Sequence, residues 1–172
     1  RPQDWEWNAN APERVRRRAQ MGGKEKWNNL LSHLKVPLLA RAYFSLRRNA
    51  AVGVDKVTWQ DYRKGLDQNL HNLQDRIQRG AYHPPPVRRQ YIPKADGKKR
   101  PLGIPALVDK VVQQAVRMLL DPIFEAQFVG FSYGFRPGRS QHDALNALHV
   151  ALKRRTCWLL NADIKSFFDS VK

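Results

Sequence analysis

Two extended runs flanking an Asp-Gly pair constrain the fold of this 172-residue chain more than any other feature. Residues 87–94 and 98–104 combine β-branched, aromatic and basic residues, and Asp96-Gly97 between them suits a tight turn. Pro84-Pro85-Pro86 stands just before the first run, and proline disfavours helix in the residue that precedes it. The sequence therefore predicts an extended spacer that leads into an antiparallel hairpin.

The predicted hairpin is strongly basic. Its cations are Arg88, Arg89, Lys94, Lys98, Lys99 and Arg100. Charge on an edge strand protects a sheet from aggregation, and this is one explanation of the pattern. Asp96 is the only acidic residue in this segment. The remaining excess of positive charge is more than edge protection requires. We therefore favour a role in binding phosphates.

The whole chain shares this excess of positive charge. It has 31 Lys and Arg against 15 Asp and Glu, a net charge of +16. Because such an excess destabilises a compact state unless a polyanion neutralises it, nucleic acid is the first partner to expect, with an anionic membrane as the rival. The basic residues are spread over loops, strands and helices instead of gathering on one amphipathic helix, and no apolar run approaches the ~18 residues of a membrane span. A single cysteine and the lack of a signal peptide favour a reducing, cytoplasmic setting without membrane contact.

Helical periodicity stands on both sides of the hairpin. Apolar residues at spacings of three and four predict helices over 35–49, from Thr58 to a stop at Gly80, and over 107–120. Pro122 is expected to lie beyond the end of the last of these. Residues 1–28 are polar, with arginines clustered at 14–18, and are expected to form a solvated tail that could order on RNA.

Capping pairs and one glycine mark the ends of the predicted helices. Thr58 with Asp61, and Ser140 with Asp143, resemble capping boxes, and the second pair would open a helix through residue 152. Gly53, in the turn between the first two helices, is expected to supply an unusual backbone angle.

Two further segments carry candidate functional residues. The Gly- and Pro-rich loop 132–140 combines aromatic residues with Arg136 and Arg139, which suits stacking on bases and pairing with phosphates. The apolar run 157–163 has the length of a strand and ends on Asp163, and a strand that brings a carboxylate to a sheet edge can hold a divalent metal where phosphates react. The alternative is that Asp163 caps the following helix.

Four sequence blocks stand in order along the chain. They are Gly53-Val-Asp55-Lys-Val-Thr-Trp; Tyr91-Ile-Pro-Lys-Ala-Asp-Gly-Lys-Lys-Arg-Pro-Leu-Gly-Ile-Pro105; Ser132-Tyr-Gly-Phe-Arg-Pro-Gly-Arg-Ser-Gln-His-Asp143; and Ala162-Asp-Ile-Lys-Ser-Phe-Phe-Asp169. Together they closely resemble the fingers and early palm of reverse transcriptases encoded by bacterial group II introns, which are also splicing maturases. The resemblance covers roughly residues 35–172, and four blocks in order make chance unlikely.

The resemblance implies an α+β fold. Reverse-transcriptase fingers, with helices around a small antiparallel sheet, would be followed by the first strand and helix of a palm. The implied domains are a basic N-terminal extension at 1–34, fingers with template-contacting segments at 35–140, and the start of the palm at 141–172, just past the first catalytic aspartate block.

The resemblance also implies a catalytic centre. Asp163 resembles the first metal-binding aspartate of the polymerase palm, and its carboxylate with the carbonyl of Ile164 would hold Mg²⁺ against the incoming triphosphate. Phe167 or its neighbour Phe168 resembles the aromatic residue that lies under the nucleotide sugar and excludes a 2′-hydroxyl. The alternative is that both phenylalanines are core residues.

Basic residues of the fingers are assigned by the same resemblance. Lys94 and Arg100 resemble the residues that clamp the triphosphate and base of the nucleotide. Arg136 and the loop around it resemble the segment that contacts the template. The RNA-binding residues that we expect are Arg88, Arg89, Lys98, Lys99, Arg136 and Arg139.

The implied function is the N-terminal portion of an RNA-directed DNA polymerase. Its partners would be intron RNA as template, a DNA primer and dNTPs, with Mg²⁺ as cofactor, and its oligomeric state is not indicated. The second catalytic block of the family, a Tyr-Ala-Asp-Asp turn, is absent from these 172 residues, so we expect them not to polymerise alone. The alternative is a non-catalytic, maturase-like remnant that binds structured RNA.

Overall fold

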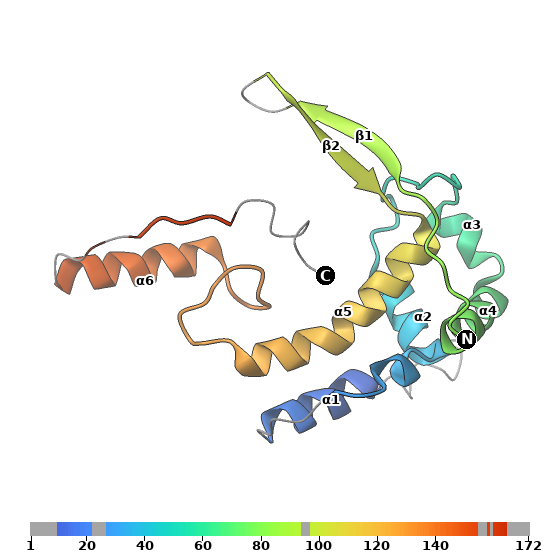
Figure 1. Ribbon diagram of the computed structural model, residues 1–172, viewed down its shortest axis with the longest axis horizontal. Coiled ribbons are helices and arrows are strands. Elements are labelled where there is room, and N and C mark those ends of the chain that lie inside the picture. Colours follow the sequence, from blue (N-terminus) through green and yellow to red (C-terminus); the bar gives the residue numbers. More distant parts are fainter. Residues whose placement is uncertain (1–9, 22–26, 94–96, 155–157, 159, 165–172) are drawn as a thin grey trace. The chain divides into compact units, whose positions relative to one another are not determined.

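The computed structural model describes residues 10–21, 27–93, 97–154, 158 and 160–164, which fall into two compact units (Figure 1). The first unit extends to Gln127 and the second begins at Phe128. The elements of the first unit are α1 (Ala11–Gln20), the 3₁₀ turn η2 (Leu30–His33), α2 (Val36–Ser45), α3 (Trp59–Arg63), α4 (Leu66–Gln78), β1 (Arg88–Pro93), β2 (Lys99–Ile104) and α5 (Leu107–Gln127). The second unit contains α6 (Gln141–Arg154). The α+β class is confirmed by these helices and the small antiparallel sheet.

The core of the first unit lies around α2, which packs against α4 and α5. Leu39 and Tyr43 on this helix are wholly buried. The Tyr43 ring stacks on Trp59 with the ring centroids 4.6 Å apart, and its hydroxyl donates to the Trp59 carbonyl at 2.7 Å. Burial raises the pKa of Tyr43 to about 12, so this hydroxyl remains a donor at neutral pH. The pair fixes the start of α3 against α2.

The expectation of a solvated tail over residues 1–28 is wrong for residues 11–20, which form α1 and pack on α5. Ala11 and Val15, one helical turn apart, are buried in the common core. Pro12 in the first turn, Glu13 beside it and arginines in the last turn all suit a helix in this direction. A narrow apolar stripe is enough here because α5 supplies the complementary surface.

The single helix expected after Thr58 is two helices. The Thr58 cap is confirmed, since its hydroxyl accepts from the Asp61 backbone N–H at 3.1 Å, but α3 ends at Arg63 and α4 begins after Gly65. Glycine favours such a break because it loses the most conformational entropy in a helix. The Asn69 side chain donates to the Tyr62 carbonyl at 3.1 Å and so satisfies part of the interrupted ladder.

Two other helix ends differ from expectation. α2 ends at Ser45 rather than residue 49, with Leu46 already in an extended conformation. α5 continues through Pro122 to Gln127, so the expected end before Pro122 is wrong. Pro122 and Ile123 are both buried, and their packing compensates for the backbone hydrogen bond that proline removes.

The predicted hairpin is confirmed. β1 and β2 pair antiparallel from Arg88↔Ile104 to Pro93↔Lys99. Figure 1 shows the two strands extending away from the helices of the first unit. All strand residues are exposed except Ile104, so the hairpin is a projection from the core rather than a part of it.

The capping box of the second unit is also confirmed. The Asp143 backbone N–H donates to the Ser140 hydroxyl at 3.2 Å, and the Ser140 N–H donates to the Asp143 carboxylate at 2.8 Å. The strand expected at 157–163 differs: positions 158 and 160–163 have no regular secondary structure, and 157 and 159 lie outside the described residues. A strand needs a partner, and the part of the chain that the structure describes offers none to this segment.

No helix within the described ranges has the length and apolar character needed to cross a membrane.

Candidate nucleic-acid interface

The base of the hairpin is fixed to the helical body through the loop 51–53. The Arg88 side chain donates from Nε to the Val52 carbonyl at 3.0 Å, and the Lys110 ammonium of α5 donates to the Ala51 carbonyl. Arg88 therefore has a structural partner inside the protein in addition to any external one.

Gly53 belongs to the same junction, but for a different reason from the one expected. Its backbone is not in the left-handed region, so the expectation of an unusual angle is wrong. A Cβ atom at this position would lie 2.5 Å from the Cα atom of Ala106, just before α5. Gly53 is required because the loop and the start of α5 approach too closely for a side chain.

The register divides the hairpin residues between two faces, because directly paired residues point to the same side of a sheet. One face carries Arg89 and Lys99 with Tyr91 between them. The opposite face carries Arg100, Ile92 and Leu102, together with Arg88 at the base. Arg89 and Lys99 therefore share a face that excludes Arg100.

The face with Arg89 and Lys99 has the properties of a nucleic-acid surface. Both cations are exposed, and the Tyr91 side chain between them is 56% exposed. Cations that pair with phosphates and an aromatic ring on which a base can stack are the two components of single-strand recognition. Lys98, just before β2, is also exposed, and Lys94 lies outside the described residues.

The loop of the second unit places its two arginines differently from each other. Arg136 is 9% exposed and donates from one Nη to the carbonyls of Val129 and Ser132, both at 2.8 Å, with its guanidinium 5.0 Å from the Phe128 ring centroid. Arg139 is exposed; it donates to the Gly130 carbonyl at 3.0 Å.

Arg136 therefore holds the loop together from within, and Arg139 lies on its surface. Phe135, directly before Arg136 in the sequence, has a positive φ of 57° and a fully exposed ring. The sequence predicted that the aromatic residues of this loop suit stacking on bases; of the two, Phe135 is exposed and Tyr133 is half-buried. An exposed aromatic residue and an exposed arginine in the same loop are again suited to a base and its phosphate.

Asp163 and Ile164 lie in the irregular segment at 160–164 and are exposed. Phe167 and Phe168 lie outside the described residues. Among the described residues, no group of three or more His, Cys, Asp or Glu is placed to hold a metal ion. A carboxylate and a neighbouring carbonyl are ligands of the type that Mg²⁺ prefers, but they fill only part of a shell of about six oxygens.

The amino-acid sequence of the chain is similar to that of known proteins. Residues 92–172 match the family described as Reverse transcriptase (RNA-dependent DNA polymerase). The chain is 43% identical to Protein YkfC of Escherichia coli over 136 residues, which cover 77% of this chain and 36% of that protein.

Two further relatives carry informative names. Group II intron-encoded protein LtrA of Lactococcus lactis is 36% identical over 162 residues, which cover 92% of this chain and 27% of that protein. Nuclear intron maturase 1, mitochondrial, of Arabidopsis thaliana is 34% identical over 67 residues, or 39% of this chain and 9% of that protein. The chain thus spans 36% or less of the length of these relatives.

Proposed function

Because this chain belongs to the reverse transcriptase family of group II intron-encoded proteins, we propose that it supplies the fingers and the beginning of the palm of an RNA-directed DNA polymerase. The observation that carries the proposal is the exposed basic hairpin, fixed at its base and bearing cations on both faces. Residues 35–140 would be the fingers and 141–172 the start of the palm. Residues 1–34 would be an extension that α1 joins to the fingers through its packing on α5.

Members of this family bind nucleic acid. The specific partners that we propose are group II intron RNA as template, a DNA primer and incoming dNTPs. The face with Arg89, Tyr91 and Lys99 would bind RNA, with Arg139 and its loop as a second contact. The single cysteine of the chain agrees with a reducing, cytoplasmic setting.

The opposite face of the hairpin would serve the nucleotide. Arg100 lies there, near the tip that continues to Lys94, and both would hold the triphosphate and base. Ile92 and Leu102 are exposed, at 37% and 41%, and would give this face an apolar surface beside the charge.

Reverse transcriptases use divalent metal ions, and the ion proposed here is Mg²⁺. Asp163 would hold it through its carboxylate and Ile164 through its carbonyl, with Phe167 or Phe168 under the sugar of the nucleotide. Bound Mg²⁺ would stabilise the negative charge that develops during phosphoryl transfer. The further ligands of its shell would come from carboxylates outside the described residues.

The RNA-binding role can be tested through the salt dependence of affinity. We expect the logarithm of RNA affinity to fall linearly with the logarithm of salt concentration, because phosphate contacts release counterions. Arg89→Ala with Lys99→Ala should reduce that slope by about one unit per lost phosphate contact. Fluorescence anisotropy with labelled intron RNA at several salt concentrations measures both quantities.

A matched control removes two exposed cations elsewhere in the first unit. Arg47→Ala with Arg79→Ala changes the net charge equally but leaves the hairpin intact. If this control lowers the slope as much as the hairpin pair does, the binding surface is not the hairpin.

The catalytic role separates the polymerase from the maturase-like alternative. In the full-length protein, Asp163→Asn should abolish primer extension with dNTPs and Mg²⁺ while leaving RNA affinity unchanged. Primer extension that survives this substitution would contradict the assignment of Asp163. Full-length protein that binds RNA tightly but does not extend a primer would favour the non-catalytic alternative.

A further inference from the structure

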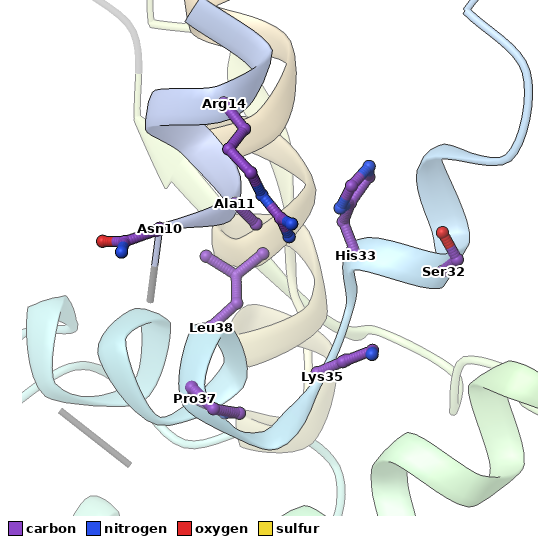
Figure 2. Close-up of a pocket in the computed structure, with 8 residues that line it drawn as sticks. All are labelled: Asn10, Ala11, Arg14, Ser32, His33, Lys35, Pro37 and Leu38. Atoms are coloured by element: carbon purple, nitrogen blue, oxygen red, sulfur yellow. The ribbon is translucent and has the colours of Figure 1, made fainter. Parts of the chain in front are cut away.

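A pocket in the first unit lies apart from the hairpin, between the start of α1, η2 and the start of α2. Its volume is about 550 Å³, and it is lined by Asn10, Ala11, Arg14, Ser32, His33, Lys35, Pro37 and Leu38 (Figure 2). Pockets that hold small molecules have volumes of about 300–1,000 Å³, so this one has room for a nucleotide as well as for an ion.

The polar part of the lining is basic. Arg14 comes from α1, His33 from η2 and Lys35 from the residue before α2. No described side chain accepts a hydrogen bond from these three residues or forms an ion pair with them, and none of the described residues that line the pocket is acidic. The positive charges of Arg14 and Lys35 repel each other and disfavour the imidazolium form of His33, and a bound anion relieves both effects.

The geometry directs two of these groups to one place. Figure 2 shows the Arg14 guanidinium and the His33 imidazole reaching toward the same space from α1 and η2, with the Leu38 side chain beside them. Burial lowers the pKa of His33, and the neighbouring charges of Arg14 and Lys35 lower it further. Ser32 adds a hydroxyl, although its present partner is the Asn29 carbonyl at 2.8 Å.

The remaining lining is apolar. Ala11 and Leu38 are buried members of the core, and Pro37 is half-buried beside them. A pocket with a few convergent charged groups and an apolar wall is suited to a ligand that has both a phosphate and a ring system. A solvated cluster of exposed cations would need neither the apolar wall nor the pocket.

We propose that this pocket binds one phosphorylated nucleotide unit, with its phosphate on Arg14, His33 and Lys35 and its sugar or base against Ala11, Pro37 and Leu38. The nucleotide can belong to an RNA chain or be free in solution, since the chemistry recognised is the same. The pocket is separate from the hairpin surface in residues and elements, so the inference does not depend on the proposed function.

The test uses adenosine monophosphate as probe and the complete 172-residue chain as protein. We expect saturable binding, measured by the NMR shifts of the His33 ring, and a higher His33 pKa in the bound form because the phosphate favours the imidazolium. The charged groups that act on His33 are Arg14 on α1 and Lys35 before α2, while α4 reaches η2 through the neutral Gln78.

Arg14→Gln should weaken binding of the probe by about tenfold, the effect of one lost charge-assisted contact. The matched control is Arg17→Gln, which removes the same charge from the same helix. The Arg17 Nε atom lies 3.8 Å from Oε1 of Glu13, and Arg17 does not line the pocket. This control should change the affinity by less than about twofold. Both arginines are exposed, so neither substitution removes a core contact.

A 5′-phosphorylated RNA oligomer, added as competitor, identifies the source of the nucleotide. Displacement of the probe would assign the pocket to RNA, and persistence of the probe would assign it to a free nucleotide. Equal losses in Arg14→Gln and Arg17→Gln, or probe binding that leaves the His33 ring unshifted, would overturn the proposal. Arg89→Ala with Lys99→Ala should leave probe binding intact. The proposal for the pocket can therefore hold even if the hairpin proves not to bind RNA.

Discussion

The two units of the chain keep their apolar side chains in different environments. In the first, Leu39 and Val111 are fully buried in a core that joins α1, α2, α4 and α5. In the second, the leucines of α6 are exposed, with Leu145 at 59% and Leu148 at 41%. Arg136 is the one buried residue among those that the structure describes in the second unit. Local signals define α6, whereas tertiary packing defines the helices of the first unit.

The largest expected effect is at the centre of the core. Leu39→Ala should lower the free energy of unfolding by about 2–5 kcal/mol, because it removes buried methyl groups and leaves a cavity. Leu148→Ala, the same change on α6, should alter it by less than about 0.5 kcal/mol. Urea denaturation followed by circular dichroism measures both.

Similar losses from the two leucine substitutions would break the comparison. They would mean that α6 is packed in solution as firmly as α2.

A smaller effect is expected from matched glycine substitutions. Gly53→Ala should destabilise the first unit by about 1–3 kcal/mol, because the new Cβ would lie 2.5 Å from the Cα atom of Ala106. Gly130→Ala in the second unit should be neutral or stabilise by up to about 1 kcal/mol, since nothing lies within 4 Å of its Cβ position. Thermal unfolding of the two variants compares them directly.

The hairpin gives a second readout for Gly53→Ala. Its base is tied to the same loop by Arg88, so faster amide exchange in β1 should accompany the loss of stability. Unchanged exchange would show that the loop and the hairpin move independently.

The smallest effect concerns a feature that the two units share. Hydrogen bonds from the hydroxyls of Thr58 and Ser140 hold the pKa of Asp61 and of Asp143 below the ordinary value of 3.8. Because the pKa of each carboxyl is lower in the folded protein, each cap contributes its full stability at pH values above the ordinary pKa of 3.8. That contribution is lost as the pH falls through the folded pKa. Carboxyl NMR titration should give midpoints below 3.8 for both residues.

The hydroxyls provide the control for this titration. Thr58→Ala and Ser140→Ala should each return the midpoint of the partner carboxyl toward 3.8. A midpoint that does not move would assign the shift to some other group.

Sequence reasoning succeeded where the signal is local. The Asp-Gly turn predicted the hairpin, and the Ser140 and Thr58 caps predicted two helix starts, because each depends on residues within a few positions. It failed where packing against a segment far along the chain determines the local structure. α1 has only two buried residues, and it is part of the core because α5 packs against it.

The candidate interface shows the same difference between what local sequence predicts and what only the folded structure reveals. The basic character of the hairpin could be predicted from composition, but the placement of Arg100 opposite Arg89 and Lys99 required the register. The resemblance assigned Arg136 to a template-contacting segment, and only the structure reveals that its guanidinium donates to two carbonyls of its own loop. The stripe through Leu119 and Ile123 did contain the signal that α5 runs past Pro122.

The cations that support the fold are held mainly by backbone carbonyls. Arg88, Lys110 and Arg136 all donate to peptide oxygens, and none of these bonds involves a carboxylate. A peptide group carries a dipole but no net charge, so these carbonyl contacts strengthen the structure without themselves neutralising the positive charge of the side chains. The resulting potential extends over about a Debye length into solution and would accelerate the approach of a polyanion before any contact forms. Residues that hold the protein together therefore also increase its rate of association.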